Sequence, residues 1–488
     1  MTEALSQVSS RPPLTFREKL CYGLGDVSNG LASSSVGLWF LYYLTDVAGL
    51  ASLYAGIAIM IGRAWDAVTD PLMGWIADHT NSRWGKRRPY LLFGCIPYAI
   101  SFFALWVVPD FHNEVLVFAY ITVALIIFNT CLTVVFVPYT SLTAAITDDY
   151  HERTSLTGFR MTSAQAAYLA GAAIPSSLVP WILSPNGEAL LQATGIYALF
   201  GSWAGTPRSG YFLTALILSA IMVPSILATF FGTQERDTGR ASMPQLNQTP
   251  LTYASSILDQ LQGNKPFRSS VAIFILTNCA ATLIAVNLPF YVEYVLDLEK
   301  YRTNIIMLLF VTAILSMPVW VMITKRFGKS ETYSIAVLLF AAMLCLLPLI
   351  EARELSTAYL MAVVMGFFYA AAQMIPWAIM PDVVEYDELR TGHRREGLFY
   401  GGTTFSYKLA TALAIFLSGL YLGMIGYVPN VAQSSHTIAG IKAIIGPIPA
   451  FIFLMGVFVA RKHPLTAKKH AQIRQELAQR YKDQQKSE

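Results

Sequence analysis

Long apolar segments follow one another along almost the whole chain, and polar residues are confined to the stretches between them. The 488-residue sequence is 55% hydrophobic and only 13% charged, whereas a soluble domain carries about a quarter charged residues. An apolar segment of about 20 residues is long enough to cross the hydrocarbon core of a bilayer as a helix. The sequence therefore predicts an all-α membrane protein that crosses the cell membrane many times.

Twelve spans are predicted, and lysine and arginine set their orientation. The spans lie near residues 19–46, 50–77, 90–109, 114–145, 158–184, 210–232, 269–297, 303–325, 331–350, 357–386, 398–426 and 437–460. Lysine and arginine are frequent in both tails and in alternate loops, whereas the opposite loops contain only Arg208, Lys300, Arg302 and Arg353. Because cytoplasmic loops carry the excess of positive residues, both termini are expected to be cytoplasmic, which requires an even number of spans.

Three matched pairs of motifs indicate an internal duplication. The pairs are Pro138-Tyr139 with Pro376-Trp377, Arg83-Trp84-Gly85-Lys86 with Arg326-Phe327-Gly328-Lys329, and Arg160 with Lys408. Their separations of 238, 243 and 248 residues agree near half the length of the chain. Two parallel six-helix halves with a midplane site between them describe the major facilitator architecture.

This architecture divides the chain into five predicted parts. They are a cytoplasmic N-tail (1–18), an N-terminal six-helix bundle (19–232), a cytoplasmic central loop (233–268), a C-terminal six-helix bundle (269–460) and a cytoplasmic C-tail (461–488). Residues 251–261 of the central loop have two open interpretations: an amphipathic helix at the membrane surface, or part of a flexible tether between the halves.

Charges inside an apolar segment are the strongest functional signal. Arg63, Asp66 and Asp70 fall within an arc of about 60° on a helix, and charges at membrane depth are costly and by default mark an ion or substrate path. Two carboxylates one turn apart suit the binding of a coupling Na⁺ or H⁺, and Thr69 and Thr133 would add neutral oxygens. Arg63 would balance part of the charge when no cation is bound. The alternative is a static ion-pair cluster between helices.

Three further polar residues lie in predicted spans. Asp26, in a stretch of small residues, is a candidate substrate ligand or a partner of Arg160; its alternative role is packing at the cytoplasmic interface. Arg160 is a candidate substrate ligand, although it lies close enough to its helix end to extend toward water. Lys408 lies ten residues inside its predicted span, too deep to reach water easily, and is the third candidate substrate ligand.

The loop between spans 2 and 3 is basic. It could serve only as an orientation signal, or act as a cytoplasmic gate that pairs with acids at other helix ends and holds one state of the transporter. The predicted gate residues are Asp78, Arg83, Lys86, Arg87 and Arg88, with Asp148, Asp149, Asp382 and Glu385 as their acidic partners.

Other classes of site find no support in the sequence. No motif resembles a phosphate-binding loop, and the five cysteines and seven histidines have no metal-ligand spacing. The net charge of +4 is not a nucleic-acid signature, because its excess lies in loops and in the tail. We therefore expect no enzyme activity, no cofactor or metal beyond the coupling cation, and no nucleic-acid partner. The expected partners are a small-molecule substrate and membrane lipid, and a monomer suffices.

Four runs carry a resemblance that covers nearly the whole chain. They are Gly62-Arg-Ala-Trp-Asp66-Ala-Val-Thr-Asp70-Pro, Arg83-Trp-Gly-Lys-Arg-Arg-Pro89, Val137-Pro-Tyr139 and Pro381-Asp-Val-Val-Glu-Tyr386. With them the sequence resembles the glycoside–pentoside–hexuronide:cation symporter family, which includes the melibiose permeases, within the major facilitator superfamily. It is also similar to the animal sodium-dependent lysophosphatidylcholine transporters.

The resemblance implies roles for the same residues. Asp66 and Asp70, with Thr69 and Thr133 beside them, match the cation site. Asp26 and Arg160 match sugar-binding residues, and Lys408 matches a buried lysine between cation and substrate. The substrate pocket departs from both groups: Phe136 stands in place of a second sugar-binding aspartate, Thr140 and Gln373 in place of sugar-stacking tryptophans, and Ala285 in place of an acid of the lysolipid transporters.

The leading hypothesis is a secondary active symporter that couples Na⁺ or H⁺ to a small organic solute by alternating access. A sugar or glycoside is the first expectation for the solute, on the ground of the resemblance, and a lysophospholipid or other amphiphile is the alternative. A non-transporting membrane receptor is a further alternative, but such a protein has no need of several buried charges.

Overall fold

Two compact units emerge from the contacts in the computed structural model. The structure describes residues 13–111, 113–147, 150–194, 196–235, 263–392, 396–465 and 467–487. Unit 1 comprises residues 1–35, 68–109 and 123–245, and unit 2 comprises residues 36–67, 110–122 and 246–488. Three helices therefore pass from one unit into the other, and each unit is described below by itself.

The predicted spans of the N-terminal part are all helical. The helices are α2 (Phe16–Tyr42), continued by the π-helix η2 (Tyr43–Val47), then α3 (Ser52–His79), α4 (Arg88–Leu105), α5 (Glu114–Ile146), α6 (Tyr150–Ile182) and α8 (Pro207–Gly232). A short α7 (Pro185–Ala193) and the 3₁₀-helix η3 (Ile196–Trp203) connect α6 to α8. The axis turns by 83° between α6 and α7.

The predicted spans of the C-terminal part are helical as well. The helices are α10 (Lys265–Phe290) with the π-helix η4 (Tyr291–Val295), η5 (Glu299–Tyr301), α11 (Arg302–Phe327), α12 (Lys329–Leu346), η6 (Leu347–Leu349), α13 (Leu355–Thr391), α14 (Glu396–Met424), α15 (Ser435–Ile445) and α16 (Pro447–Arg461). The C-tail forms α17 (Ala467–Ser487). The predicted amphipathic helix at 251–261 lies outside the described residues.

Among the described residues, nine helices are long and apolar enough to cross a membrane, or ten if the bent pair α6 and α7 is one span. The helices α2 and α3 are not among them, although both coincide with predicted spans. The physical reason is their polar content, since α2 carries Asp26 among small polar residues and α3 carries Arg63, Asp66 and Asp70. The chain is thus an integral, multi-pass helical membrane protein, and twelve spans remain a prediction.

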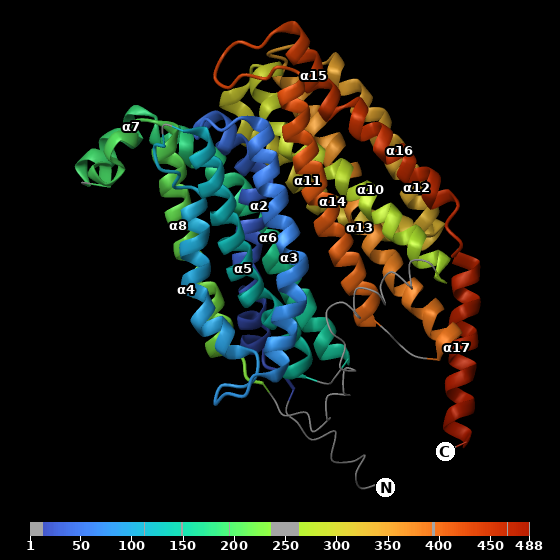
Figure 1. The fold of residues 1–488 in the computed structure, drawn as a ribbon. Helices are drawn as coiled ribbons and strands as arrows, with labels where there is room; N and C mark the ends of the chain where they lie inside the picture. Colours follow the sequence, from blue (N-terminus) through green and yellow to red (C-terminus); the bar gives the residue numbers. More distant parts are fainter. Residues whose placement is uncertain are drawn as a thin grey trace. The chain divides into compact units, whose positions relative to one another are not determined.

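In unit 2, α10 packs against α13, α14, α15 and α16, while α12 packs against α13 and α16 (Figure 1). The last predicted span is broken into α15 and α16 at Gly446, whose φ and ψ of −108° and −93° are not helical. A Cβ at Gly446 would lie 2.8 Å from the carbonyl oxygen of Leu344, so the break also permits a close approach to α12. The C-terminal α17 packs on α13.

In unit 1, α8 packs against both α4 and α6. Gly210 allows the close contact with α6, because a Cβ there would lie 2.9 Å from the backbone of Val179. The rings of Trp106 and Tyr211 stack with centroids 5.5 Å apart between the ends of α4 and α8. In unit 1, close backbone packing and ring stacking thus join α8 to α6 and to α4.

The two π-helices occupy matching positions in the sequence. Tyr43 of η2 and Tyr291 of η4 are 248 residues apart, the spacing that also separates Arg160 from Lys408. Each π-helix is closed by the same pair of backbone bonds, including Leu50 N–H to Leu44 O (2.8 Å) and Leu298 N–H to Val292 O (3.0 Å). Such π-turns are rare and occur frequently at functional sites. Their recurrence supports the predicted duplication.

Candidate functional site

Helix α3 carries four of the predicted site residues within two turns. Asp66 and Asp70 are one turn apart on it, Thr69 lies between them, and Arg63 lies one turn before Asp66. Asp66 is fully buried, Thr69 is buried, and Asp70 and Arg63 are partly exposed. The helix forms despite these charges because a segment that lies in a membrane must satisfy its backbone hydrogen bonds internally.

In unit 1, the hydroxyl groups of two threonines lie close to the Asp70 carboxylate. The Thr133 hydroxyl, on α5, donates to Asp70 Oδ1 at 2.8 Å and lies 3.3 Å from the hydroxyl oxygen of Thr69. One carboxylate and two hydroxyls are thus brought together. Hard cations prefer oxygen ligands of this kind.

In unit 2, Asp66 forms an ion pair with Lys408. The Lys408 ammonium, on α14, lies 3.3 Å from Asp66 Oδ2, and the Asp66 side chain is only 1% exposed. A carboxylate at such depth is costly unless a positive charge compensates it. The sequence places Lys408 among candidate substrate ligands, and the structure shows that its contact in this state is Asp66. The charge-balancing role of Arg63 stays a prediction.

Asp26 and Arg160 form a second buried pair, within unit 1. Arg160 Nε lies 3.3 Å from Asp26 Oδ2, and Asn29 donates to the other carboxylate oxygen at 3.3 Å. The sequence allows Arg160 either to pair with Asp26 or to extend toward water at its helix end. The structure contains the ion pair with Asp26.

Aromatic rings surround this pair. Tyr22 and Tyr139 stack with centroids 5.1 Å apart, and the Tyr139 hydroxyl donates to the carbonyl oxygen of Tyr22 at 2.8 Å. Phe136 contacts Tyr139 with a centroid distance of 6.0 Å. An acid, a guanidinium and aromatic faces suit a solute with polar groups on an apolar body, since binding sites commonly combine apolar walls with a few placed polar groups.

The basic loop between α3 and α4 is held by a residue that sequence reasoning missed. The backbone N–H groups of Lys86, Arg87 and Arg88 donate to the Glu235 carboxylate at 2.9, 2.7 and 3.0 Å. Gly85 has a φ of 103°, and a Cβ there would collide with this carboxylate. Glu235 satisfies N–H groups at the start of α4 that have no intrahelical partner.

The other predicted gate residues of this loop are placed as follows. The Arg83 guanidinium stacks on the Trp84 ring at 4.1 Å. Asp78 lies in the last turns of α3, and Asp148 and Asp149 lie outside the described residues.

The predicted gate acids of unit 2 have partners within that unit. Asp382 Oδ1 lies 2.5 Å from the Lys329 ammonium, which also donates to the carbonyl oxygen of Ala378. His470 Nε2, on α17, lies 2.7 Å from Glu385 Oε2 and 3.4 Å from Asp382 Oδ1. Of these two partners, Lys329 belongs to the repeated Arg-Phe-Gly-Lys motif found in the sequence. His470 was not predicted from the sequence. Pairing of these acids with the basic loop stays a prediction.

Replacement of Glu235 tests the anchoring of the basic loop. Glu235→Ala is expected to speed tryptic cleavage within residues 83–88 several-fold in the purified protein, because three backbone N–H groups lose their acceptor and a typical hydrogen bond contributes about 0.5–1.5 kcal/mol. Cleavage is followed by mass spectrometry of the fragments. Glu351→Ala, at an exposed residue, is the matched control. Equal cleavage rates for wild type and both variants would contradict this role of Glu235.

A family model described as "MFS/sugar transport protein" matches residues 21–467 of the chain. The chain belongs to this family. Among its relatives, an uncharacterised symporter of Synechocystis is 30% identical over 98% of this chain and 99% of its own length. The glucuronide carrier protein homologue of Escherichia coli is 30% identical over 97% of both chains. The mouse sodium-dependent lysophosphatidylcholine symporter 1 is 28% identical over 95% of this chain and 88% of its own.

Solved structures show the same MFS transporter fold. A bacterial homologue of the human lysosomal transporter Spinster, in an inward-facing and occupied conformation, aligns with a TM-score of 0.66 over 93% of this chain and 97% of its own at 11% identity. The nucleoside transporter NupG aligns with a TM-score of 0.61 over 92% of this chain and 99% of its own at 13% identity. This MFS protein is therefore a membrane transporter of the symporter-containing family, as the resemblance implied.

Proposed function

We propose that the protein is a secondary active symporter that moves a sugar or glycoside together with Na⁺ or H⁺ by alternating access. The architecture we propose is the one expected from the sequence, with two six-helix halves, twelve spans and both termini in the cytoplasm. Sodium-dependent symporters and a glucuronide carrier homologue among the relatives support a coupling cation and an organic solute.

The ion pair between Asp66 and Lys408 carries the proposal. We assign the coupling cation to Asp66 and Asp70, with Thr69 and Thr133 as further oxygen ligands. The Lys408 ammonium lies 3.3 Å from Asp66 Oδ2 and neutralises the buried carboxylate. A cation that binds Asp66 competes with this ammonium and frees it. Lys408 then becomes available to the substrate, so that cation binding favours substrate binding.

Asp26 and Arg160 are the proposed substrate ligands in unit 1. Their ion pair leaves carboxylate and guanidinium groups that can bind hydroxyl or anionic groups of a solute, and the stacked Tyr22 and Tyr139 offer apolar faces. A ligand shifts the equilibrium between two conformations only through its differential affinity for them. Solute and cation bound together would therefore favour the closed, translocating form.

A lysophospholipid is the second candidate substrate. Phe136 supports it, because an apolar ring beside Tyr139 suits an acyl chain better than a hydroxylated ring. Arg160 would then bind the phosphate, since the guanidinium group is a common phosphate ligand. The named activity of the lysophosphatidylcholine symporters among the relatives also favours this candidate.

Loss of the Arg160 guanidinium is expected to raise KM for the solute at least tenfold with a smaller change in maximal rate. The physical reason is that Asp26 then lacks its ion-pair partner and the solute lacks a charged ligand. Initial rates of uptake into proteoliposomes measure the effect of Arg160→Ala. Arg353→Ala, at an exposed ion pair, is the control. An unchanged KM for Arg160→Ala would contradict the assignment.

A transport panel tests the proposed function as a whole. Purified protein in liposomes is supplied with an inward Na⁺ gradient, an inward H⁺ gradient or none, against sugars, glucuronides and lysophosphatidylcholines. We expect accumulation of one solute class with one cation gradient. Binding of a solute without accumulation under any gradient would favour a receptor instead.

A further inference from the structure

One buried carboxylate, that of Asp46, fixes the C-terminal end of α2. Asp46, in η2, is 8% exposed, and all of its partners described here belong to unit 2. Its Oδ1 accepts hydrogen bonds from the hydroxyls of Tyr294 and Tyr427, both at 2.5 Å. Its Oδ2 accepts from the Thr45 hydroxyl at 2.5 Å.

Asn430 completes the same cluster from the loop after α14. Its side-chain amide donates to the backbone carbonyl oxygen of Asp46 at 2.8 Å, and its backbone N–H donates to the Tyr294 hydroxyl at 3.1 Å. Burial, and next the charge of Asp46, raise the pKa of Tyr427, so its hydroxyl stays a donor across physiological pH. We call Asp46, Tyr294, Tyr427 and Asn430 the distal clasp.

A cation–π contact lies beside the distal clasp. The Arg302 guanidinium, at the start of α11, lies 5.0 Å from the ring centroid of Tyr42 and 5.2 Å from that of Trp39. It also donates to Glu293 Oε2 at 2.6 Å. The end of α2 is therefore tied to η4, to α11 and to the loop after α14 through polar and aromatic contacts.

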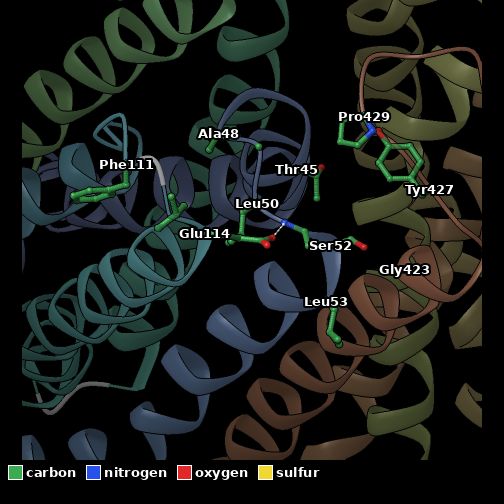
Figure 2. A pocket seen from close by; sticks show the side chains of 13 residues that line it. Thr45, Ala48, Leu50, Ser52, Leu53, Phe111, Glu114, Gly423, Tyr427 and Pro429 are labelled. Atoms are coloured by element: carbon green, nitrogen blue, oxygen red, sulfur yellow. Dashed lines mark hydrogen bonds between the residues drawn. The ribbon is translucent and has the colours of Figure 1, made fainter.

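Water has a route to the distal clasp. A cavity of about 590 Å³ is lined by Thr45, Ser52, Glu114, Gly423 and Tyr427 among others (Figure 2). The Glu114 carboxylate forms one wall and accepts a hydrogen bond from Ala51 N–H at 2.8 Å. Because Thr45 and Tyr427 line the cavity and also bind Asp46, an incoming water molecule can compete for their hydroxyls.

Close packing of α3 and α14 lies next to this cavity. A Cβ at Gly419 would collide with the carbonyl oxygen of Ser52, and a Cβ at Gly56 would lie 3.1 Å from the carbonyl oxygen of Phe416. Small residues permit such close approach of two membrane helices. The distal clasp adds hydrogen bonds beside this close backbone packing.

We propose that the distal clasp is the gate on the side of the membrane away from the termini, and that release of Asp46 from Tyr294 and Tyr427 opens the transport path to that side. The inference rests on the proposed function in that it assumes alternating access with the termini in the cytoplasm. The Asp46 carboxylate binds hydroxyl groups from two distant segments, and π-turns end both α2 and α10. A few hydrogen bonds therefore decide whether the end of α2 stays joined to η4 and to the loop after α14.

Thiol labelling from outside the cell tests the gate. Ala55, fully buried beside Gly56, is replaced by cysteine after the five native cysteines are changed to alanine. Asp46→Asn is expected to speed modification by a membrane-impermeant maleimide about tenfold, because an amide oxygen is a weaker acceptor for tyrosine hydroxyls than a carboxylate and a weaker clasp raises the open population. Tyr427→Phe, which removes one donor, is expected to act in the same direction.

The control and the contrary result are defined by the structure. Asp297→Asn makes the same chemical change in an exposed ion pair with Arg353, and we expect it to leave the labelling rate unchanged. Labelling of Asp46→Asn and of Tyr427→Phe at the control rate would overturn the proposal. If Asp46→Asn does not fold, as judged by size-exclusion chromatography, the result for Tyr427→Phe decides. The labelling assay needs neither solute nor cation. The gate can therefore be contradicted while symport is demonstrated, and symport can be contradicted while the gate is supported.

Discussion

Asp66→Asn is expected to abolish gradient-driven solute uptake, with a fall of at least roughly 100-fold. The fully buried Asp66 carboxylate is a proposed ligand of the coupling cation, and the neutral amide lacks the negative charge that attracts a cation. A factor of ten corresponds to about 1.4 kcal/mol, so a hundredfold fall requires a loss of about 2.8 kcal/mol in cation binding. Asp70→Asn should have the same effect, because Asp70 is the acid that Thr133 binds. Uptake into proteoliposomes under an imposed cation gradient is the measurement.

Membrane insertion distinguishes a lost site from a lost fold. Both variants keep the shape of the side chain, and we expect wild-type amounts in the membrane and an unchanged elution on size-exclusion chromatography. Asp297→Asn again serves as a matched acid-to-amide control at an exposed position. Wild-type accumulation by both Asp66→Asn and Asp70→Asn would contradict the cation site.

Lys408→Met is expected to move cation affinity and transport in opposite directions. Without the ammonium that competes for Asp66, a cation should bind about tenfold more tightly, because it no longer has to displace Lys408 from the buried carboxylate and charge pairs at such depth are strong. Solute uptake should nevertheless fall at least tenfold, because the freed lysine is the proposed link between cation and substrate. Cation-dependent thermal stabilisation of the purified protein measures the first effect, and proteoliposome uptake measures the second.

The comparison variant for this prediction is Lys300→Met, at an exposed lysine, which should change neither quantity. Weaker cation binding by Lys408→Met would show that the lysine supports the cation site instead of competing with it. Unchanged uptake would show that Lys408 has no part in coupling.

The sequence predicted those parts of the site that lie close together along one helix. Asp66 and Asp70 stand out because charges are scarce in an apolar segment, and helix periodicity alone places them one turn apart. The sequence also singled out Arg160 and Lys408, yet it could not assign Lys408 to Asp66. That contact joins α3 to α14, and pairing between distant helices depends on packing, which local patterns do not encode.

The distal clasp and the anchor of the basic loop were missed for a related reason. With 25 tyrosines in the chain, the positions of Tyr294 and Tyr427 do not stand out, and aromatic residues are common where membrane helices meet water. A signal was present in the repeat: residues 40–50 and 288–298 align at the spacing of Arg160 and Lys408. No such signal pointed to Glu235. Its partners are backbone N–H groups, which every residue except proline provides, so the side chains of the loop do not reveal the contact.

Solute-driven cation movement is the most direct test of coupling through Asp66. Proteoliposomes without any cation gradient receive an inward gradient of the transported solute, and entry of Na⁺ or H⁺ is followed with a tracer or a pH-sensitive dye. We predict that the cation enters with the solute in wild-type protein and that neither moves in Asp66→Asn. Solute entry without the cation, or cation movement in the opposite direction, would contradict symport.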